Sequence, residues 1–161
     1  MSVLDNLRLD SKVAVVTGAG RGLGRAMAIA LAGASCGIVA AARTRAQIEE
    51  TAELVRTESH RSLPVPTDIT DPASVQAMVD AAIAEFGRTG ITVNAIGAGW
   101  IEGMGLLADE DARRQLERYL SGKRPAQPEE IAGAAVYLAS DVAEYPTEQV
   151  VWVEGGTLSH V

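Results

Sequence analysis

The chain has 161 residues, the length of a single domain, and 14 Lys and Arg against 21 Asp and Glu give it a formal net charge of −7. This acidic balance argues against nucleic acid or an anionic membrane surface as a partner. A single cysteine, Cys36, excludes an internal disulfide, and the two histidines, His60 and His160, lie in no ligand spacing, so we expect no metal site. Residues 1–12 lack the apolar core of a signal peptide, and we expect a cytoplasmic protein.

Strand-like and helix-like segments alternate along the chain. The expected strands are residues 12–17, 36–42, 63–67, 91–96 and 149–153. The expected helices are residues 22–33, 45–57, 72–86, 109–120 and a last one that begins at Pro128. This alternation predicts an α/β fold, with a Rossmann-like, doubly wound and mostly parallel sheet in one domain over residues 1–161.

The third expected strand contains Pro64 and Pro66. Neither proline can donate a hydrogen bond to a neighbouring strand, so this strand is expected at a sheet edge. The most apolar stretch, residues 26–42, is broken by glycines and is shorter than the roughly 20 residues of a membrane-spanning helix. It is therefore interpreted as helix, turn and strand.

The segment TGAGRGLG, Thr17 to Gly24, joins the first strand to the first helix. In this position a glycine triplet is typical of a dinucleotide-binding turn, in which the first glycine allows the tight turn, the second lets the backbone approach the pyrophosphate, and the third lets helix and strand pack closely. The free amides at the helix start bind phosphate oxygens. The candidate cofactor-binding residues are Gly18, Ala19, Gly20, Arg21, Gly22, Leu23 and Gly24.

The end of the second strand predicts which dinucleotide is bound. NAD-binding folds carry an Asp or Glu there for the ribose 2′-hydroxyl, but this chain has Ala42, followed by Arg43. Two guanidiniums, on Arg21 and Arg43, suit a 2′-phosphate, so NADP is favoured over NAD. The alternative is that both arginines are solvated surface residues.

These segments resemble the short-chain dehydrogenase/reductase family over nearly the whole chain. TGAGRGLG matches its glycine loop, TDITDP (67–72) resembles the segment after its third strand, and GITVNAIGAGWIEG (90–103) resembles its sixth strand and the loop beneath the nicotinamide. QPEEIAGAAVYLASD (127–141) and VVWVEGG (150–156) resemble its penultimate helix and last strand. The resemblance implies adenine contacts by Asp68 and Ile69, and a backbone contact to the carboxamide at Ile101. The family usually has Pro-Gly where this chain has Ala98-Gly99, and often Thr where it has Gly103.

The resemblance also implies an internal deletion near residues 88–90. AEFGR (84–88) and GITVNA (90–95) are separated only by Thr89, where the family has two further strand–helix units. That segment carries the family's Asn-Asn-Ala-Gly sequence, its catalytic Ser and its Tyr-x-x-x-Lys pair, in which the Tyr hydroxyl is the general acid/base. We therefore assign no catalytic residue and expect about five strands instead of seven. The last two strands must either pair directly with the first or leave its edge open.

One string, Tyr119 to Lys123, has the Tyr-x-x-x-Lys spacing formally. It falls at the end of a charged helix, with Gly122 inside it, and is interpreted as a surface tyrosine. Trp100 is equally compatible with a wall of the nicotinamide pocket and with an anchor for its loop, and Cys36 is interpreted as inert core.

Three functional hypotheses remain from the sequence. The chain is an NADP-dependent oxidoreductase of small carbonyls or alcohols, a nucleotide-binding module without catalysis, or a non-functional deletion product. The absent Ser, Tyr and Lys favour the second over the first. The oligomeric state is left open, because the resemblance places the usual dimer helices in the missing segment.

Overall fold

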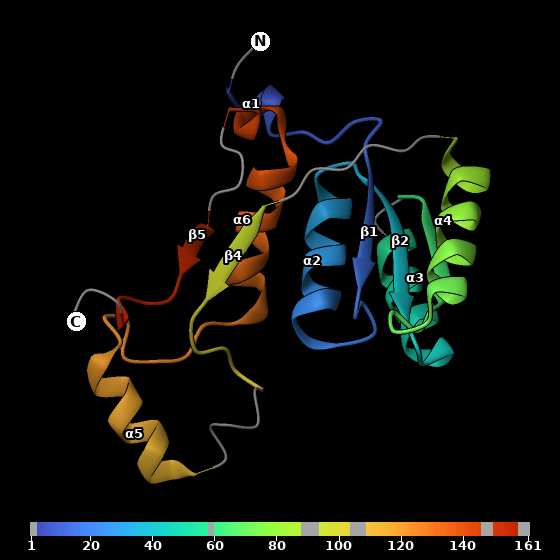
Figure 1. The fold of residues 1–161 in the computed structure, drawn as a ribbon. Helices are drawn as coiled ribbons and strands as arrows, with labels where there is room; N and C mark the ends of the chain where they lie inside the picture. The colour runs from blue at the N-terminus through green and yellow to red at the C-terminus, as the bar shows by residue number, and fades with distance from the viewer. Residues whose placement is uncertain (1–2, 58–59, 88–93, 104–108, 146–149, 158–161) are drawn as a thin grey trace.

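The computed structural model describes residues 3–57, 60–87, 94–103, 109–145 and 150–157. Its elements are α1 (Val3–Asn6), β1 (Val13–Thr17), α2 (Gly22–Gly33), β2 (Gly37–Ala42), α3 (Arg45–Thr57), β3 (Ser62–Pro66), α4 (Pro72–Phe86), β4 (Ala95–Ala98), α5 (Glu110–Tyr119), α6 (Pro128–Ala139), the short 3₁₀ helix η2 (Asp141–Ala143) and β5 (Val150–Val153). The described residues thus contain five strands that alternate with helices, which confirms the α/β expectation (Figure 1).

The first sheet is parallel and has the order β1-β2-β3. β3 lies at one edge, as its two prolines predicted, with Pro64 opposite Ala40 and Pro66 opposite Ala42. β2 is buried between its neighbours, and its Ile38, Val39, Ala40 and Ala41 are fully enclosed. This is the burial that a continuous apolar run in a parallel sheet requires.

Helices cover the two faces of this sheet unequally. On one face α2 and α3 pack over Val16, Ile38 and Ala40, with Leu31 and Ile48 among the buried side chains. On the other face α4 is the only described helix that covers the sheet, through Met78 and Ala82 against Val39 and Ala41. The doubly wound expectation therefore holds, but one helical layer is much smaller than the other.

Local signals in the sequence explain where α4 begins and ends. The Asp71 carboxylate accepts a hydrogen bond from the Ala73 amide (3.0 Å), and Pro72 occupies the first turn, where its missing N–H costs nothing. Gly87 ends the helix in the left-handed conformation with φ +68°. All three positions agree with the sequence-based prediction.

The last two strands form a second sheet. β4 and β5 pair in parallel, with Ala95 opposite Val150 and Ala98 opposite Val153. α6 packs against β4, β5 and α2 and so joins the two sheets (Figure 1). The structure thus chooses between the two arrangements expected for the last strands: neither pairs with β1, and the edge of β1 stays open in the described part of the chain.

Candidate cofactor site

The β1–α2 turn has the backbone geometry of a turn that only glycine adopts without strain. Gly18 and Gly22 have φ +68° and +54°, and a Cβ at either position would meet no atom within 4 Å. A Cβ on Gly24 would lie 2.4 Å from the Gly18 carbonyl oxygen and 2.7 Å from its carbon. The first two glycines therefore face open space, whereas the third allows the start of α2 to pack against the turn.

Side chains from α2 and α3 hold the carbonyls of this turn. Arg25 Nη2 donates to the Gly20 carbonyl (2.6 Å), and Thr51 Oγ1 donates to the Ala19 carbonyl (2.8 Å). Arg25 Nε also donates to Thr51 Oγ1 (3.1 Å), and the guanidinium pairs with Glu50 (2.9 Å). Because these contacts use carbonyl oxygens, they fix the turn without occupying the amides at the start of α2.

Arg25 and Thr51 support this turn, and the sequence-based candidates did not include them. Thr51 is fully buried on the packed face of α3, and its Oγ1 also lies within hydrogen-bond distance of the Gln47 carbonyl (3.1 Å). The one sequence signal was a small polar residue on the apolar stripe of α3, beside Ile48 and Val55.

The start of α2 is open to an anion. The residue before it, Arg21, is extended and makes no side-chain capping bond, and the first turn contains no acidic residue. The first amides of a helix have no partner within the helix, and they lie at the positive end of its dipole. The turn therefore presents backbone donors without a competing carboxylate, as phosphate binding requires.

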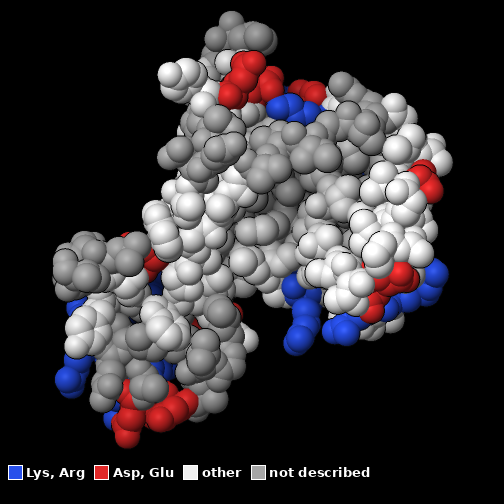
Figure 2. Space-filling view, viewed as in Figure 1, with Lys and Arg blue, Asp and Glu red and all other residues white. Residues whose placement is uncertain are grey.

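The two predicted arginines differ from their neighbours in pairing. In the described part of the chain, Arg25 pairs with Glu50 and Arg45 pairs with Glu49, but no ion pair involves Arg21 or Arg43. Both of these side chains are exposed. Lys and Arg side chains gather at the lower end of the first sheet, below the carboxyl ends of β1 and β2 (Figure 2).

Asp68 lies at the same end of the first sheet, just after β3. Its carboxylate accepts hydrogen bonds from the Thr70 amide (2.9 Å) and hydroxyl (2.7 Å), and these bonds lower the pKa of the Asp68 carboxyl. The nearby positive charge of Arg43 lowers this pKa further. The Asp68 amide donates to Ser74 Oγ (3.0 Å), and the following side chain, Ile69, is exposed. The structure therefore brings Arg43 and Asp68 together across the ends of β2 and β3.

Ile101 follows β4. The carboxyl ends of β4 and β1 lie at the same end of the molecule (Figure 1). Ala126 donates to the Trp100 carbonyl and accepts from the Glu102 amide, both at 2.8 Å. In such a parallel bridge the intervening residue directs its N–H and C=O to the other side, so the Ile101 backbone faces away from Ala126. Its side chain is buried. The Gly99 amide donates to the Val153 carbonyl (2.9 Å), which holds the start of this loop on β5.

The formal Tyr-x-x-x-Lys string does not form a pair on one helix. Tyr119 is the last residue of α5 and is exposed, and Lys123 lies beyond the helix with φ +54°. Lys123 Nζ donates to the Arg118 carbonyl (2.9 Å). This geometry agrees with a surface tyrosine next to a lysine that caps carbonyls at a helix end.

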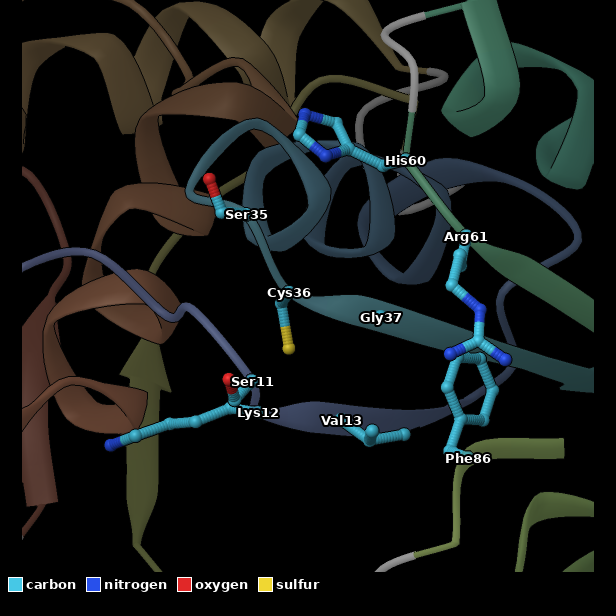
Figure 3. Close-up of a pocket in the computed structure, with 9 residues that line it drawn as sticks. All are labelled: Ser11, Lys12, Val13, Ser35, Cys36, Gly37, His60, Arg61 and Phe86. Carbon is cyan, nitrogen blue, oxygen red and sulfur yellow. The ribbon is translucent and has the colours of Figure 1, made fainter. Parts of the chain in front are cut away.

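A cavity of about 430 Å³ lies at the opposite end of the first sheet (Figure 3). Cys36 directs its sulfur into it, and burial raises the pKa of this thiol to about 11. Its two cationic side chains are already paired, Lys12 with Asp141 (2.6 Å) and Arg61 with Glu85 (2.7 Å). Arg61 also lies over the Phe86 ring at 4.7 Å. Cys36 is 2% exposed, as expected for core. Among the described residues that line the cavity, no Lys, Arg, Asp or Glu is therefore without an ion-pair partner.

The described residues contain neither a metal-binding cluster nor a membrane-spanning helix. No group of three or more His, Cys, Asp or Glu side chains is placed to hold a metal ion. No helix in the same ranges has the length and apolar character needed to cross a membrane.

Comparison with known proteins places these features in a family. The family model described as short chain dehydrogenase matches residues 12–123. An uncharacterised oxidoreductase of Mycobacterium tuberculosis is 40% identical over 95 residues, which are 59% of this chain and 36% of that protein. The chain spans about a third of the length of the curated relatives that it matches.

Solved structures agree on the fold. A 7α-hydroxysteroid dehydrogenase complexed with NADH has a TM-score of 0.90 at 20% identity, with 97% of this chain and 98% of that one covered. A 2-deoxy-D-gluconate 3-dehydrogenase from Agrobacterium tumefaciens with bound NADP, itself assigned only provisionally, has a TM-score of 0.80 at 23% identity, with 96% and 99% covered. The glycine turn, the parallel strands and the family match over residues 12–123 lead to one conclusion: the chain belongs to the short-chain dehydrogenase family.

Proposed function

We propose that this chain is a cytoplasmic dinucleotide-binding protein that prefers NADP(H) to NAD(H). The observation that carries the preference is the pair of arginines without ion-pair partners, Arg21 and Arg43, beside Ala42 where an NAD-binding fold has an acid. A 2′-phosphate would give both guanidiniums a direct anionic partner, whereas a 2′-hydroxyl would add no charge and would leave Arg43 with only the nearby Asp68 carboxylate. Of the two similar structures, one was solved with NADH and the other with NADP. The proposed preference for NADP(H) therefore rests on the two arginines of this chain.

The residues present fit the cofactor. The open space at Gly18 and Gly22 leaves room for a pyrophosphate at the start of α2, and the uncapped amides there would hold it. Asp68 and Ile69 would contact the adenine, and the Ile101 backbone would hold the carboxamide. When bound, the nicotinamide of such a cofactor donates or accepts hydride.

We also propose that the chain alone does not carry out the family's reaction, the oxidoreduction of a small carbonyl or alcohol. Proton transfer needs an acid within hydrogen-bond reach of the reacting oxygen. Tyr119, which has the formal spacing, is exposed at the end of α5, and Lys123 is turned toward the Arg118 carbonyl. Residues 1–161 then act as a single binding domain, whose apparent deletion near 88–90 lies outside the described residues. A binding domain of this kind needs no catalytic residue of its own.

Titration with NADPH tests the site directly. Gly22→Asn accepts the left-handed backbone but places a side chain in the open space, so it should remove most of the affinity. Gly87→Asn is the matched control, because Gly87 also has positive φ (+68°) and open surroundings but lies at the far end of α4. Equal affinities of the two variants, both folded by circular dichroism, would contradict the assignment.

A further inference from the structure

The outer edge of β1 carries unused backbone groups. The Gly37 amide donates to the Lys12 carbonyl (2.9 Å), which shows that Lys12 and then every second residue of β1 face β2. The N–H and C=O groups of Val13, Val15 and Thr17 therefore point away from β2. β1 pairs with no other strand in the described ranges. This outer edge of Val13, Val15 and Thr17 is called the open edge below.

The opposite edge of the same sheet is protected by its sequence. The Ile38 amide donates to the Arg61 carbonyl (2.9 Å), so the alternate residues Ser62, Pro64 and Pro66 face outward on β3. Two of these three residues have no N–H to offer to another strand. Prolines of this kind protect a natural sheet edge. The open edge has none, and its apolar sequence is that of an interior strand.

The face of β1 beside α4 is also uncovered. Val13 packs against the α4 core cluster, and Val15 lies on the same face by alternation, yet Val15 is 45% exposed. Ile83 of α4 is 43% exposed. Ser74 and Glu85 of α4 contact residues at the two ends of β3, and Ile83 lies on the opposite flank, which faces β1. An apolar surface thus borders the open edge.

The second sheet repeats this asymmetry. Val151 and Val153 are less exposed than Val150 and Trp152, so by alternation along β5 they lie on the face toward α6, which packs against this strand. Val150 and Trp152 face the other way, and Trp152 is 60% exposed above Gly97. α2 and α6, packed together, cover one face of each sheet (Figure 1). No described helix covers the opposite face over β1 or over β4 and β5.

We infer that the open edge is a docking site for a β-strand with a following helix, supplied by a second polypeptide. Strands of a parallel sheet are stable when both neighbours and both faces are covered. A parallel strand would pair with Val13, Val15 and Thr17, and its helix would cover Val15 and Ile83.

The comparisons support this occupant. The 95 residues matched in the Mycobacterium tuberculosis relative are 59% of this chain but only 36% of that protein, so that protein is long enough to contain further strand–helix units that this chain lacks. A second copy fits less well, because two β1 edges related by a two-fold axis would pair antiparallel, unlike every ladder described here.

Co-expression tests the inference. The probe is the part of the Mycobacterium tuberculosis relative that has no counterpart in this chain, carried on an affinity tag. The full chain is compared with Val15→Lys, which places a charge beside the open edge, and with Leu54→Lys, a control on α3 where Leu54 is 40% exposed. We expect the wild type and the control to be retained, retention of Val15→Lys to fall at least tenfold, and hydrogen exchange of the β1 amides to slow in the complex.

Three results would overturn the inference: no retention of the wild type, equal retention of a folded Val15→Lys, or self-association of the chain alone that Val15→Lys abolishes. The last result would assign the open edge to a second copy. If Val15→Lys does not fold, Ile83→Glu replaces it, because Ile83 borders the same edge from α4 and its variant is expected to lose retention in the same way.

Discussion

Replacing Gly24 by alanine should damage the turn from a position where alanine normally favours a helix. The new Cβ would lie 2.4 Å from the Gly18 oxygen, 2.7 Å from its carbon and 3.2 Å from the Ala19 nitrogen. All three are backbone atoms, so no side-chain rotation relieves the overlap, and α2 must move away from the turn. Overpacking costs about 1–3 kcal/mol, and the helix propensity of alanine offsets about 1 kcal/mol of that cost.

We therefore expect Gly24→Ala to lower the free energy of unfolding by up to about 2 kcal/mol and the melting temperature by up to roughly 8 °C. NADPH affinity should fall as well, because the displaced amides no longer converge. Gly133→Ala in α6 is the control: its Cβ meets no atom within 4 Å, and it should stabilise the chain by about 0.5–1 kcal/mol. Thermal unfolding by circular dichroism measures both. A Gly24→Ala variant that is as stable as Gly133→Ala would refute the packing argument.

Two further predictions concern activity and the buried thiol. The rate of NADPH oxidation with a panel of ketones and quinones should stay at background for both the chain and Tyr119→Phe. A positioned acid accelerates such a reaction by about 10²–10⁴-fold, and we assign none to this chain. Turnover that disappears in Tyr119→Phe would show that Tyr119 is catalytic. Burial raises the pKa of Cys36 from 9.0 to about 11, so the neutral thiol is favoured by folding; the resulting stability is full below pH 9 and is lost as the pH rises toward 11. At pH 8 the native thiol should alkylate roughly 100-fold more slowly than the unfolded chain, and equal rates would show that Cys36 is accessible.

The sequence predicted the order and type of the elements because each has strong local signals. The two ends of α4 are marked by Asp71, Pro72 and Gly87, and the position of β3 at a sheet edge is predicted by Pro64 and Pro66. The sequence did not predict that the strands form two separate sheets, because strand pairing depends on contacts between segments that lie far apart in the chain. The short helix α1 was not predicted, and four residues give no periodicity to detect. Residues 91–93 of the expected strand 91–96 lie outside the described residues, and β4 begins at Ala95.

The candidate site was predictable to the extent that glycine geometry is local. Positive φ at Gly18 and Gly22 follows from the tight turn that the motif requires. The supports of the turn were not predictable, because Arg25 reaches Glu50 and Thr51 reaches Ala19 across two helices. The sequence likewise could not predict which arginines form ion pairs, since nothing in the sequence distinguishes Arg45 from Arg43 in this respect.

The most direct test of the account is the comparison of NADPH and NADH affinities in the wild type, Arg43→Ala and Arg45→Ala. Arg43 forms no ion pair in the described structure, whereas Arg45 is paired with Glu49 at 3.3 Å and serves as the control. A charge-assisted contact of about 1.5–3 kcal/mol predicts that Arg43→Ala weakens NADPH binding roughly tenfold or more. NADH binding should not change, and Arg45→Ala should resemble the wild type. Equal losses for both cofactors in Arg43→Ala, or a wild type that binds NADH as tightly as NADPH, would contradict the assignment of NADP(H) to this site.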